Sequence, residues 1–210
     1  MKKYLSLIKF SHTIFAMPFA FIGFFLAQTN QFEWKILFYI VLCMVFARSS
    51  AMAFNRYIDR NIDKKNPRTA TIREIPSGKI SPKNALLFTF INVLLFITTT
   101  YFINPLCFLL SPVALIIILG YSLTKRVTYL CHLILGLGLS LAPLGSYIAV
   151  TGRFDILPIL FSVSVLFWVS GFDIIYALQD EEFDKAENLY SIPVKIGVKN
   201  SMIISKFLHF

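Results

Sequence analysis

The stretch RSSAMAFNRYIDRNIDKKNPRTATIREIPSG, residues 48–78, leads from an apolar helical run into a basic loop. Within it, Asn55, Asp59 and Asp63 recur every four residues. Because residues i and i+4 lie on one face of an α-helix, this spacing predicts one polar stripe. Adjacent carboxylates repel each other, and Mg2+, which prefers oxygen ligands, would remove that repulsion. The alternative is a solvated helix end whose acids pair with the neighbouring arginines.

The composition is that of a membrane protein. Of the 210 residues, 57% are hydrophobic and 15% are charged, and the mean hydropathy is +0.70. Soluble domains carry about 25% charged residues. The net charge of +9 comes from basic residues that lie between apolar runs, where orientation in a bilayer explains them better than nucleic-acid binding does. We therefore expect the lipid bilayer, and no nucleic acid, as a partner.

Six apolar runs approach the roughly 20 residues that a helix needs to cross a bilayer. They cover residues 12–28, 36–54, 85–103, 105–124, 130–150 and 156–178. The first run follows a basic start, as in a secretory signal peptide, but it is long for one and five runs follow, so we expect it to be retained. We predict an all-α fold, a polytopic membrane helical bundle. It should form a single transmembrane domain over residues 1–210, with motif loops at 55–84 and 179–201.

The cysteines, histidines and some glycines receive simple interpretations. Three isolated cysteines in apolar runs are typical of small buried hydrophobes. Three scattered histidines lack the spacing of metal ligands, so we assign them no role. Three glycines in the fifth span favour close helix approach. The cysteines are Cys43, Cys107 and Cys131, the histidines are His12, His132 and His209, and the glycines are Gly136, Gly138 and Gly145.

A second acidic stripe follows the sixth span, in GFDIIYALQDEEFDK. Asp173, Asp180 and Asp184 are spaced by seven and four residues, which puts them on one helix face together with Tyr176. Asp173 lies at the end of a span, where an ionisable group is costly and is therefore a candidate for function.

The charges predict how the bundle lies in the membrane. Of the 20 basic residues, all but Lys35 and Arg153 lie on the side of the bundle that holds the amino terminus and both acidic stripes. Among the acidic residues, only Glu33 and Asp155 lie on the opposite side. The positive-inside rule makes the basic side cytoplasmic.

The two stripes also suggest a ligand. Carboxylates close to lysines and arginines suit a polyanion held through Mg2+, such as a diphosphate. Because the site opens into an apolar bundle, the ligand should join a diphosphate to a hydrocarbon chain, as a prenyl diphosphate does. Arg48 shares a helix face with the first stripe, and its alternative role is snorkelling to the near membrane interface.

At these residues the sequence resembles the UbiA-type membrane prenyltransferases, in particular their 4-hydroxybenzoate polyprenyltransferase branch. The first stripe matches the family's N-x-x-x-D-x-x-x-D motif and continues as NPRTATIREIPSG, much like the segment expected there. The second stripe matches an aspartate pair preceded by a Tyr-Ala element and an upstream aspartate. The segment YSLTKR, residues 121–126, resembles the family's basic turn. The resemblance runs from about Ser11 to the end of the chain.

The resemblance implies about nine spans around a cavity in a bacterial inner membrane. It implies Mg2+-dependent transfer of a polyprenyl group from polyprenyl diphosphate to an aromatic acid in ubiquinone biosynthesis. Loss of diphosphate generates an allylic cation, which attacks the ring carbon beside a phenolic hydroxyl. The implied roles are metal binding by Asn55, Asp59, Asp63, Asp180 and Asp184, diphosphate binding by Arg68, Lys125 and Arg126, acceptor binding by Arg48, and catalysis by Asp173 and Tyr176.

Three alternatives stay open. The acceptor could be a dihydroxynaphthoate of menaquinone biosynthesis, because it too offers a phenol and a carboxylate. The chain ends at Phe210 with about six of nine spans, so it is either a truncated, inactive membrane fragment or receives the remaining spans from elsewhere, for instance a second subunit; the oligomeric state is left open. A cation channel would need charges near mid-bilayer, where the spans carry almost none.

Overall fold

The computed structural model describes residues 2–28 and 31–210, and in these the regular structure is all helical. The helices are α1 (Lys2–Leu7), α2 (Phe10–Leu26), α3 (Trp34–Ile58), α4 (Arg60–Lys65), α5 (Pro82–Tyr101), α6 (Pro105–Thr124), α7 (Cys131–Thr151), α8 (Ile156–Ala177), the 3₁₀ helix η1 (Leu178–Asp180), α9 (Glu181–Ala186) and α10 (Ile192–Leu208).

Each predicted span coincides with one long helix. Five of these helices are long and apolar enough to cross a membrane, and the sixth, α2, is apolar but has only 17 residues. The prediction of an all-α polytopic bundle with about six spans is therefore confirmed. The agreement follows from physics, because backbone polar groups in hydrocarbon must be satisfied within the helix itself.

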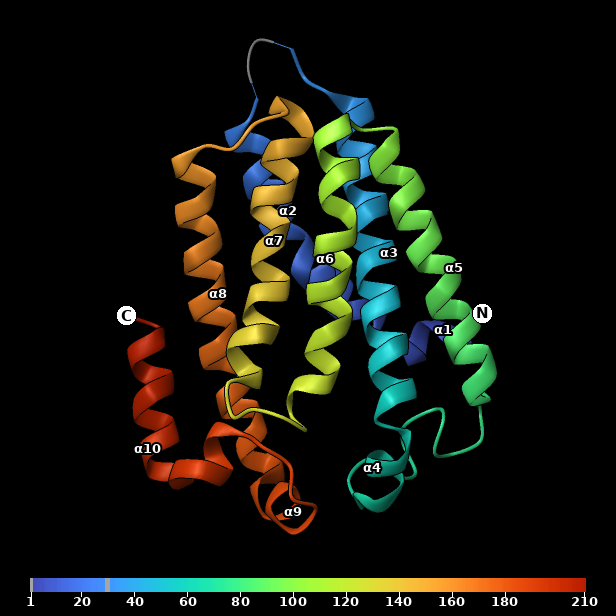
Figure 1. The fold of residues 1–210 in the computed structure, drawn as a ribbon, viewed down its shortest axis with the longest axis vertical. Coiled ribbons are helices and arrows are strands. Elements are labelled where there is room, and N and C mark those ends of the chain that lie inside the picture. Colours follow the sequence, from blue (N-terminus) through green and yellow to red (C-terminus); the bar gives the residue numbers. More distant parts are fainter. Residues whose placement is uncertain (1, 29–30) are drawn as a thin grey trace.

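The six long helices run up and down side by side (Figure 1). The short links after α5 and α7 lie at one end of the bundle. The helices α4 and α9, which contain the last aspartate of each acidic motif, lie at the other end, which we call the motif end (Figure 1). Two segments that are far apart in the sequence therefore share one end of the bundle.

At the end of the bundle opposite the motif end, the side chain of one asparagine connects neighbouring helices. The Asn104 side chain caps α6 by accepting from the Cys107 backbone N–H at 2.8 Å. Its amide also donates to the carbonyl oxygens of Ile148 and Ala149, at 2.9 and 3.2 Å. One side chain thus starts α6 and fixes it against the last turn of α7, so the turn between α5 and α6 is anchored to a third helix.

Glycine permits close helix contact at three places, and one of them is Gly171 of α8, where a Cβ would lie 2.5 Å from His209 Cε1. A Cβ on Gly23 of α2 would lie 1.9 Å from the carbonyl oxygen of Pro143 in α7. A Cβ on Gly136 of α7 would lie 2.3 Å from Ser170 Oγ of α8. The prediction for Gly136 is therefore confirmed, whereas those for Gly138 and Gly145 are wrong. A Cβ on Gly138 would make only an ordinary contact at 3.7 Å, and one on Gly145 would meet nothing within 4 Å.

The final helix bends back along the bundle. Gly197 interrupts α10 with a φ of 76°, a conformation that glycine adopts at little cost. The first part of α10 crosses the motif end, and the second part rises beside α8 (Figure 1). There the Ser205 hydroxyl donates to the Gly171 carbonyl at 2.7 Å. Residues 201–208 therefore form the part of α10 that packs on α8.

Candidate active site at the motif end

The first acidic stripe crosses the junction between α3 and α4. The backbone N–H of Asp59 donates to the Asn55 carbonyl at 2.9 Å, and that of Asp63 donates to the Asp59 carbonyl at 2.8 Å. These bonds keep the i, i+4 register through the junction. The Asn55 amide donates to Asp59 Oδ2 at 3.2 Å. The predicted stripe therefore exists, although its members lie in two successive helices.

Asp59 is the most enclosed acid of the site, with 1% of its surface exposed. Lys125 Nζ lies 2.6 Å from its Oδ2, and Arg126 Nη2 lies 2.8 Å from its Oδ1. Arg126 also donates to the Ile58 carbonyl at 3.1 Å. Both cations come from the turn after α6. The basic turn and the first motif thus form one charged cluster, in which two cations share one carboxylate.

Asp63 is also buried, at 3% exposure. Its Oδ1 accepts from Arg73, ten residues further along the same loop. Its Oδ2 has no hydrogen-bond partner in the part of the chain that the structure describes. Buried carboxylate oxygens normally have partners, because an unpaired one costs free energy. This oxygen is therefore free to bind a cation.

The second motif is held against the first by a bridge from the first loop. Arg68 Nε donates to Asp180 Oδ1 at 3.0 Å, and its Nη2 also pairs with that carboxylate. The Asn66 amide donates to the same Oδ1 at 3.0 Å. The hydrogen bonds that Arg68 itself donates to Asp180 raise the pKa of its guanidinium. A further ion pair joins Lys65 to Glu187 at 2.6 Å.

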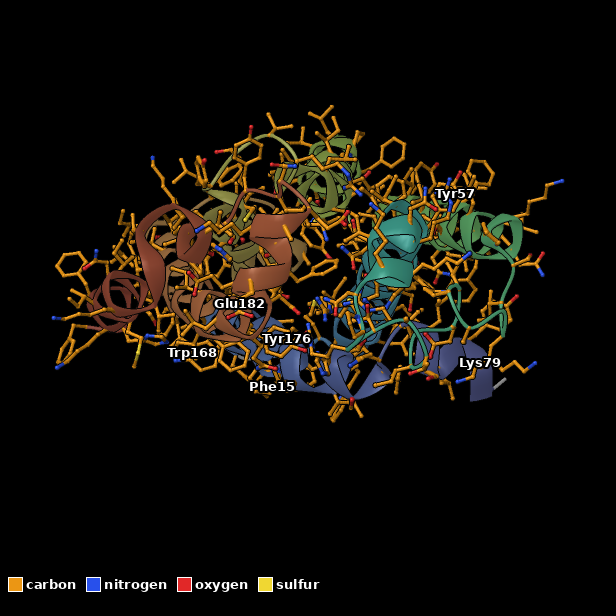
Figure 2. The ribbon with its side chains drawn as sticks, turned by 90° about the horizontal axis from the view of Figure 1, so that it is seen from below. Phe15, Tyr57, Lys79, Trp168, Tyr176 and Glu182 are labelled. Atoms are coloured by element: carbon orange, nitrogen blue, oxygen red, sulfur yellow. The ribbon has the colours of Figure 1, made fainter. Side chains whose placement is uncertain are left out.

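Tyr176 lies beside this bridge. Its hydroxyl accepts from Arg68 Nη1 at 3.3 Å, and the guanidinium lies 5.5 Å from the centre of its ring. The ring is 44% exposed. Figure 2, which looks at the motif end, shows Tyr57 on the side of the first motif and Tyr176 and Glu182 on the side of the second. An exposed aromatic face beside the acids could accept a second cationic group.

Asp173 lies one turn before Tyr176 in α8. Its Oδ2 lies 2.7 Å from Nδ1 of His132, which is 3% exposed. No pattern in the sequence indicated a role for His132, because its partner lies 41 residues away in the chain. Asn66 and Arg73 were also missed, although both belong to the basic loop that follows the first motif. The basic and polar composition of that loop could have indicated both residues, because buried carboxylates need hydrogen-bond donors.

Arg48 faces an apolar cavity of about 280 Å³ between the long helices. The lining includes Ala47, Leu139 and Ile117, with Tyr121 as another polar member. Arg48 Nε is buried without a hydrogen-bond partner in the described residues. The cavity therefore offers an unsatisfied cationic group in a mainly apolar wall.

The predicted site residues fall into two groups. The structure brings the two acidic motifs, Arg68, Lys125, Arg126 and Tyr176 to the motif end, while Arg48 stands apart at the cavity. In residues 2–28 and 31–210 no three His, Cys, Asp or Glu side chains converge as a metal site. Asp59, Asp63 and Asp180 are instead paired with arginine or lysine. Their oxygen donors are nevertheless of the type that Mg2+ selects.

Comparison with known proteins identifies the family. The model for the UbiA prenyltransferase family matches residues 16–210. A 4-hydroxybenzoate octaprenyltransferase of Aliivibrio fischeri is 34% identical over 180 residues, which are 86% of this chain and 59% of that protein. One of Photobacterium profundum is 31% identical, with the same coverage of 86% and 59%. The chain thus spans about three fifths of the length of these curated relatives.

Solved structures agree with the sequence match. An apo UbiA homologue from Aeropyrum pernix K1 superposes with a TM-score of 0.88 at 33% identity, over 95% of this chain and 74% of that one. A UbiA homologue from Archaeoglobus fulgidus bound to GPP and Mg2+ shares the fold, with a TM-score of 0.77 at 24% identity, over 98% of this chain and 73% of that one. The chain belongs to the UbiA prenyltransferase family.

Proposed function

We propose that the chain carries the active site of a membrane-bound aromatic polyprenyltransferase. It would transfer a polyprenyl group from polyprenyl diphosphate to 4-hydroxybenzoate or a similar aromatic acid, in the biosynthesis of a quinone. The acceptor assignment is supported by the names of the matched relatives. The residues 1–210 would act as a single transmembrane domain in this function.

One observation carries the proposal: two acidic motifs from distant parts of the chain meet at one end of an apolar bundle, joined by Arg68 and Asp180. An ion pair that served only to hold the two motifs together would need no further cations beside it. Here Lys125 and Arg126 add two more cations at Asp59, and an apolar cavity lies between the helices. Acids, cations and a hydrocarbon-lined space match the parts of a prenyl diphosphate with its metal.

The acids would hold Mg2+. Asp59, Asp63, Asp180 and Asp184 supply carboxylate oxygens, and Asn55 supplies an amide oxygen. The unpaired Oδ2 of Asp63 supports the fit, because that buried oxygen has no other partner in the described structure. When bound, Mg2+ would neutralise negative charge on the departing diphosphate.

The cationic side chains would bind the oxygens of the diphosphate directly. Arg68, Lys125 and Arg126 now pair with acids, and a diphosphate would offer them more strongly charged oxygens. The exposed ring of Tyr176 would face the allylic cation. Asp173 would orient the acceptor or take up its proton. Arg48 would bind the acceptor's carboxylate, which would satisfy its unpaired Nε.

The charge distribution supports an orientation for this site. The basic residues gather at the motif end, and in a bacterial inner membrane that end would face the cytoplasm, together with the amino terminus. A water-soluble acceptor and Mg2+ would then reach the site from the cytoplasm, and the prenyl chain would enter from the lipid.

The decisive experiment is an assay of the purified chain in lipid nanodiscs. A long-chain prenyl diphosphate is supplied with 4-hydroxybenzoate and with a dihydroxynaphthoate, separately and in competition. We expect a prenylated 4-hydroxybenzoate that forms with Mg2+ and not with EDTA. Preferred prenylation of the dihydroxynaphthoate would move the function to menaquinone biosynthesis.

A second arm separates an incomplete cavity from a wrong assignment. The chain is joined to the residues of the Aliivibrio fischeri relative that lie beyond the matched 180, and is assayed in the same way. Product from the joined protein alone would show that the site needs further spans. No product from either well-folded protein would refute the proposed function.

A further inference from the structure

His132 is a buried polar residue that the proposed reaction does not use. It is the second residue of α7, has 3% of its surface exposed, and lies between α8 and the start of α10. Its Nδ1 lies 2.7 Å from Asp173 Oδ2, and its Nε2 lies 3.3 Å from the backbone nitrogen of Ile192. Both ring nitrogens are therefore engaged by different segments of the chain.

The partners determine which nitrogen carries the proton. A backbone N–H can only donate, so the contact with Ile192 requires Nε2 to accept through its lone pair. Nδ1 must then hold the proton and donate it to the Asp173 carboxylate. This neutral Nδ1–H form leaves no free nitrogen for proton transfer. The ring is thus arranged for holding its neighbours in place and not for acid–base chemistry.

The segment after the second motif, residues 189–192, is docked at the same place. The Leu189 N–H donates to the Asp184 carbonyl at 2.8 Å, and the Tyr190 N–H donates to the Lys125 carbonyl at 2.7 Å. The Cys131 thiol also contacts the Tyr190 carbonyl at 3.4 Å. This segment therefore links the second motif to the basic turn whose lysine pairs with Asp59.

Ile192 is the first residue of α10, and its N–H has no acceptor within that helix. The Ser191 hydroxyl caps the helix by accepting from the Val194 N–H at 3.3 Å. The imidazole Nε2 accepts from Ile192 beside this cap. His132 thus fixes where α10 begins, and through residues 189–192 it fixes the second motif against the basic turn.

We propose that His132 is a positioning residue of the active site. Its Nδ1–H sets the orientation of the Asp173 carboxylate, and its Nε2 anchors the segment 189–192 beside Lys125. The inference rests on the proposed function for its effect on turnover, and it adds to that function a residue that fixes a catalytic group without touching the substrate.

Two amide substitutions separate the two contacts. In His132→Asn the side-chain nitrogen replaces Nδ1 and can still donate to Asp173, but nothing reaches Ile192. In His132→Gln the longer side chain can accept from Ile192, but its donor to Asp173 is lost. His209→Asn and His209→Gln are matched controls, because His209 follows the last residue of α10, where its Nδ1 lies 2.7 Å from the Ser205 carbonyl and its ring packs on Trp168.

We expect His132→Gln to lower kcat by about 10-fold to 100-fold, as is usual when an orienting partner is removed. Its KM for the prenyl diphosphate should not change, because in the proposed function Asp173 acts on the acceptor and not on that substrate. His132→Asn should recover most of the lost kcat. Equal kcat values for the two variants and for wild type would overturn the positioning of Asp173.

Two further measurements do not depend on turnover. Nitrogen-15 NMR of the three histidines should show His132 as the neutral Nδ1–H form. Hydrogen exchange of the Ile192 amide should be faster in His132→Asn than in wild type and His132→Gln. An Nε2–H or cationic ring, or equal exchange in all three, would overturn the inference. A wild type that transfers no prenyl group would count against the proposed function alone, and these two measurements would still decide the role of His132.

Discussion

Arg68 and Asp180 are 112 residues apart in the chain, yet Arg68 Nε lies 3.0 Å from Asp180 Oδ1 at the motif end. The pair closes the loop of the first motif onto the second. A guanidinium presents its donors in a flat fork that matches a carboxylate and matches a phosphate equally well. The same side chain can therefore hold the site together without substrate and bind the diphosphate when it arrives.

Arg68→Lys should weaken transfer by about 10-fold, because an ammonium keeps the charge but loses the two-pronged contact, and a lost charged hydrogen bond costs about 1.5–3 kcal/mol. The KM for the prenyl diphosphate should rise. Initial rates over a range of prenyl diphosphate concentrations check this. Arg153→Lys is the matched control at the opposite end of the bundle, and an equal effect there would contradict the role of Arg68.

Asp59→Asn should abolish transfer, and so should Asp180→Asn. In the first variant two cations, Lys125 and Arg126, lose their shared carboxylate, and breaking a buried pair typically costs about 3–5 kcal/mol. Product formation and membrane insertion are measured together. Glu182→Gln removes an exposed acid of the same motif loop and should leave the rate unchanged. Transfer retained in both aspartate variants would remove the metal site from the mechanism.

Arg48→Met should raise the KM for 4-hydroxybenzoate and leave the KM for the prenyl diphosphate unchanged. The change removes the cationic group of the cavity and keeps an unbranched apolar side chain of similar length. Phenol, which lacks the carboxylate, gives the second comparison. Wild type should prefer 4-hydroxybenzoate over phenol, and the variant should lose most of that preference. If the variant still preferred 4-hydroxybenzoate over phenol, the carboxylate of the acceptor would have to bind at a residue other than Arg48.

Gly23→Ala should destabilise the bundle by about 1–3 kcal/mol, the usual cost of overpacking. The new Cβ would lie 1.9 Å from the Pro143 carbonyl oxygen, so α2 and α7 must separate. Thermal unfolding in detergent measures the loss. Gly145→Ala adds the same methyl group to α7 where nothing lies within 4 Å, and its Tm should not fall.

Orientation can be tested with single cysteines. We expect Lys64→Cys, in the first motif loop, to react with a membrane-impermeant maleimide only from the cytoplasmic side. Arg153→Cys, between α7 and α8, should react only from the outside. The native cysteines are replaced by serine or alanine for this experiment. Labelling of both positions from the same side would refute the up-and-down arrangement.

The sequence predicts the helices well because the bilayer imposes their length and apolarity. The span 105–124 matches α6 to the residue, since Asn104 caps it and Pro105 opens it. The i, i+4 stripe of the first motif was also readable, because that spacing is local. Gly145 was misjudged, because composition does not reveal which side of a helix meets a neighbour.

The partners of the charged residues could not be predicted from the sequence. Lys125 and Arg126 were predicted to bind diphosphate, but nothing local indicated that Asp59 holds both when substrate is absent. His132 was passed over because its importance depends on Asp173 and Ile192, which other helices bring to it. Such contacts depend on the packing of whole helices, and no short pattern records them.

The contact between Gly23 and Pro143 has a consequence for biosynthesis. α2 leaves the ribosome early, whereas α7 is made only after three further long helices, α3, α5 and α6. The tight fit between them therefore cannot form while α2 is being inserted. The first membrane helix has to wait in the lipid, or beside the insertion machinery, until its partner arrives, so assembly of the bundle includes a late step that joins its earliest span to α7.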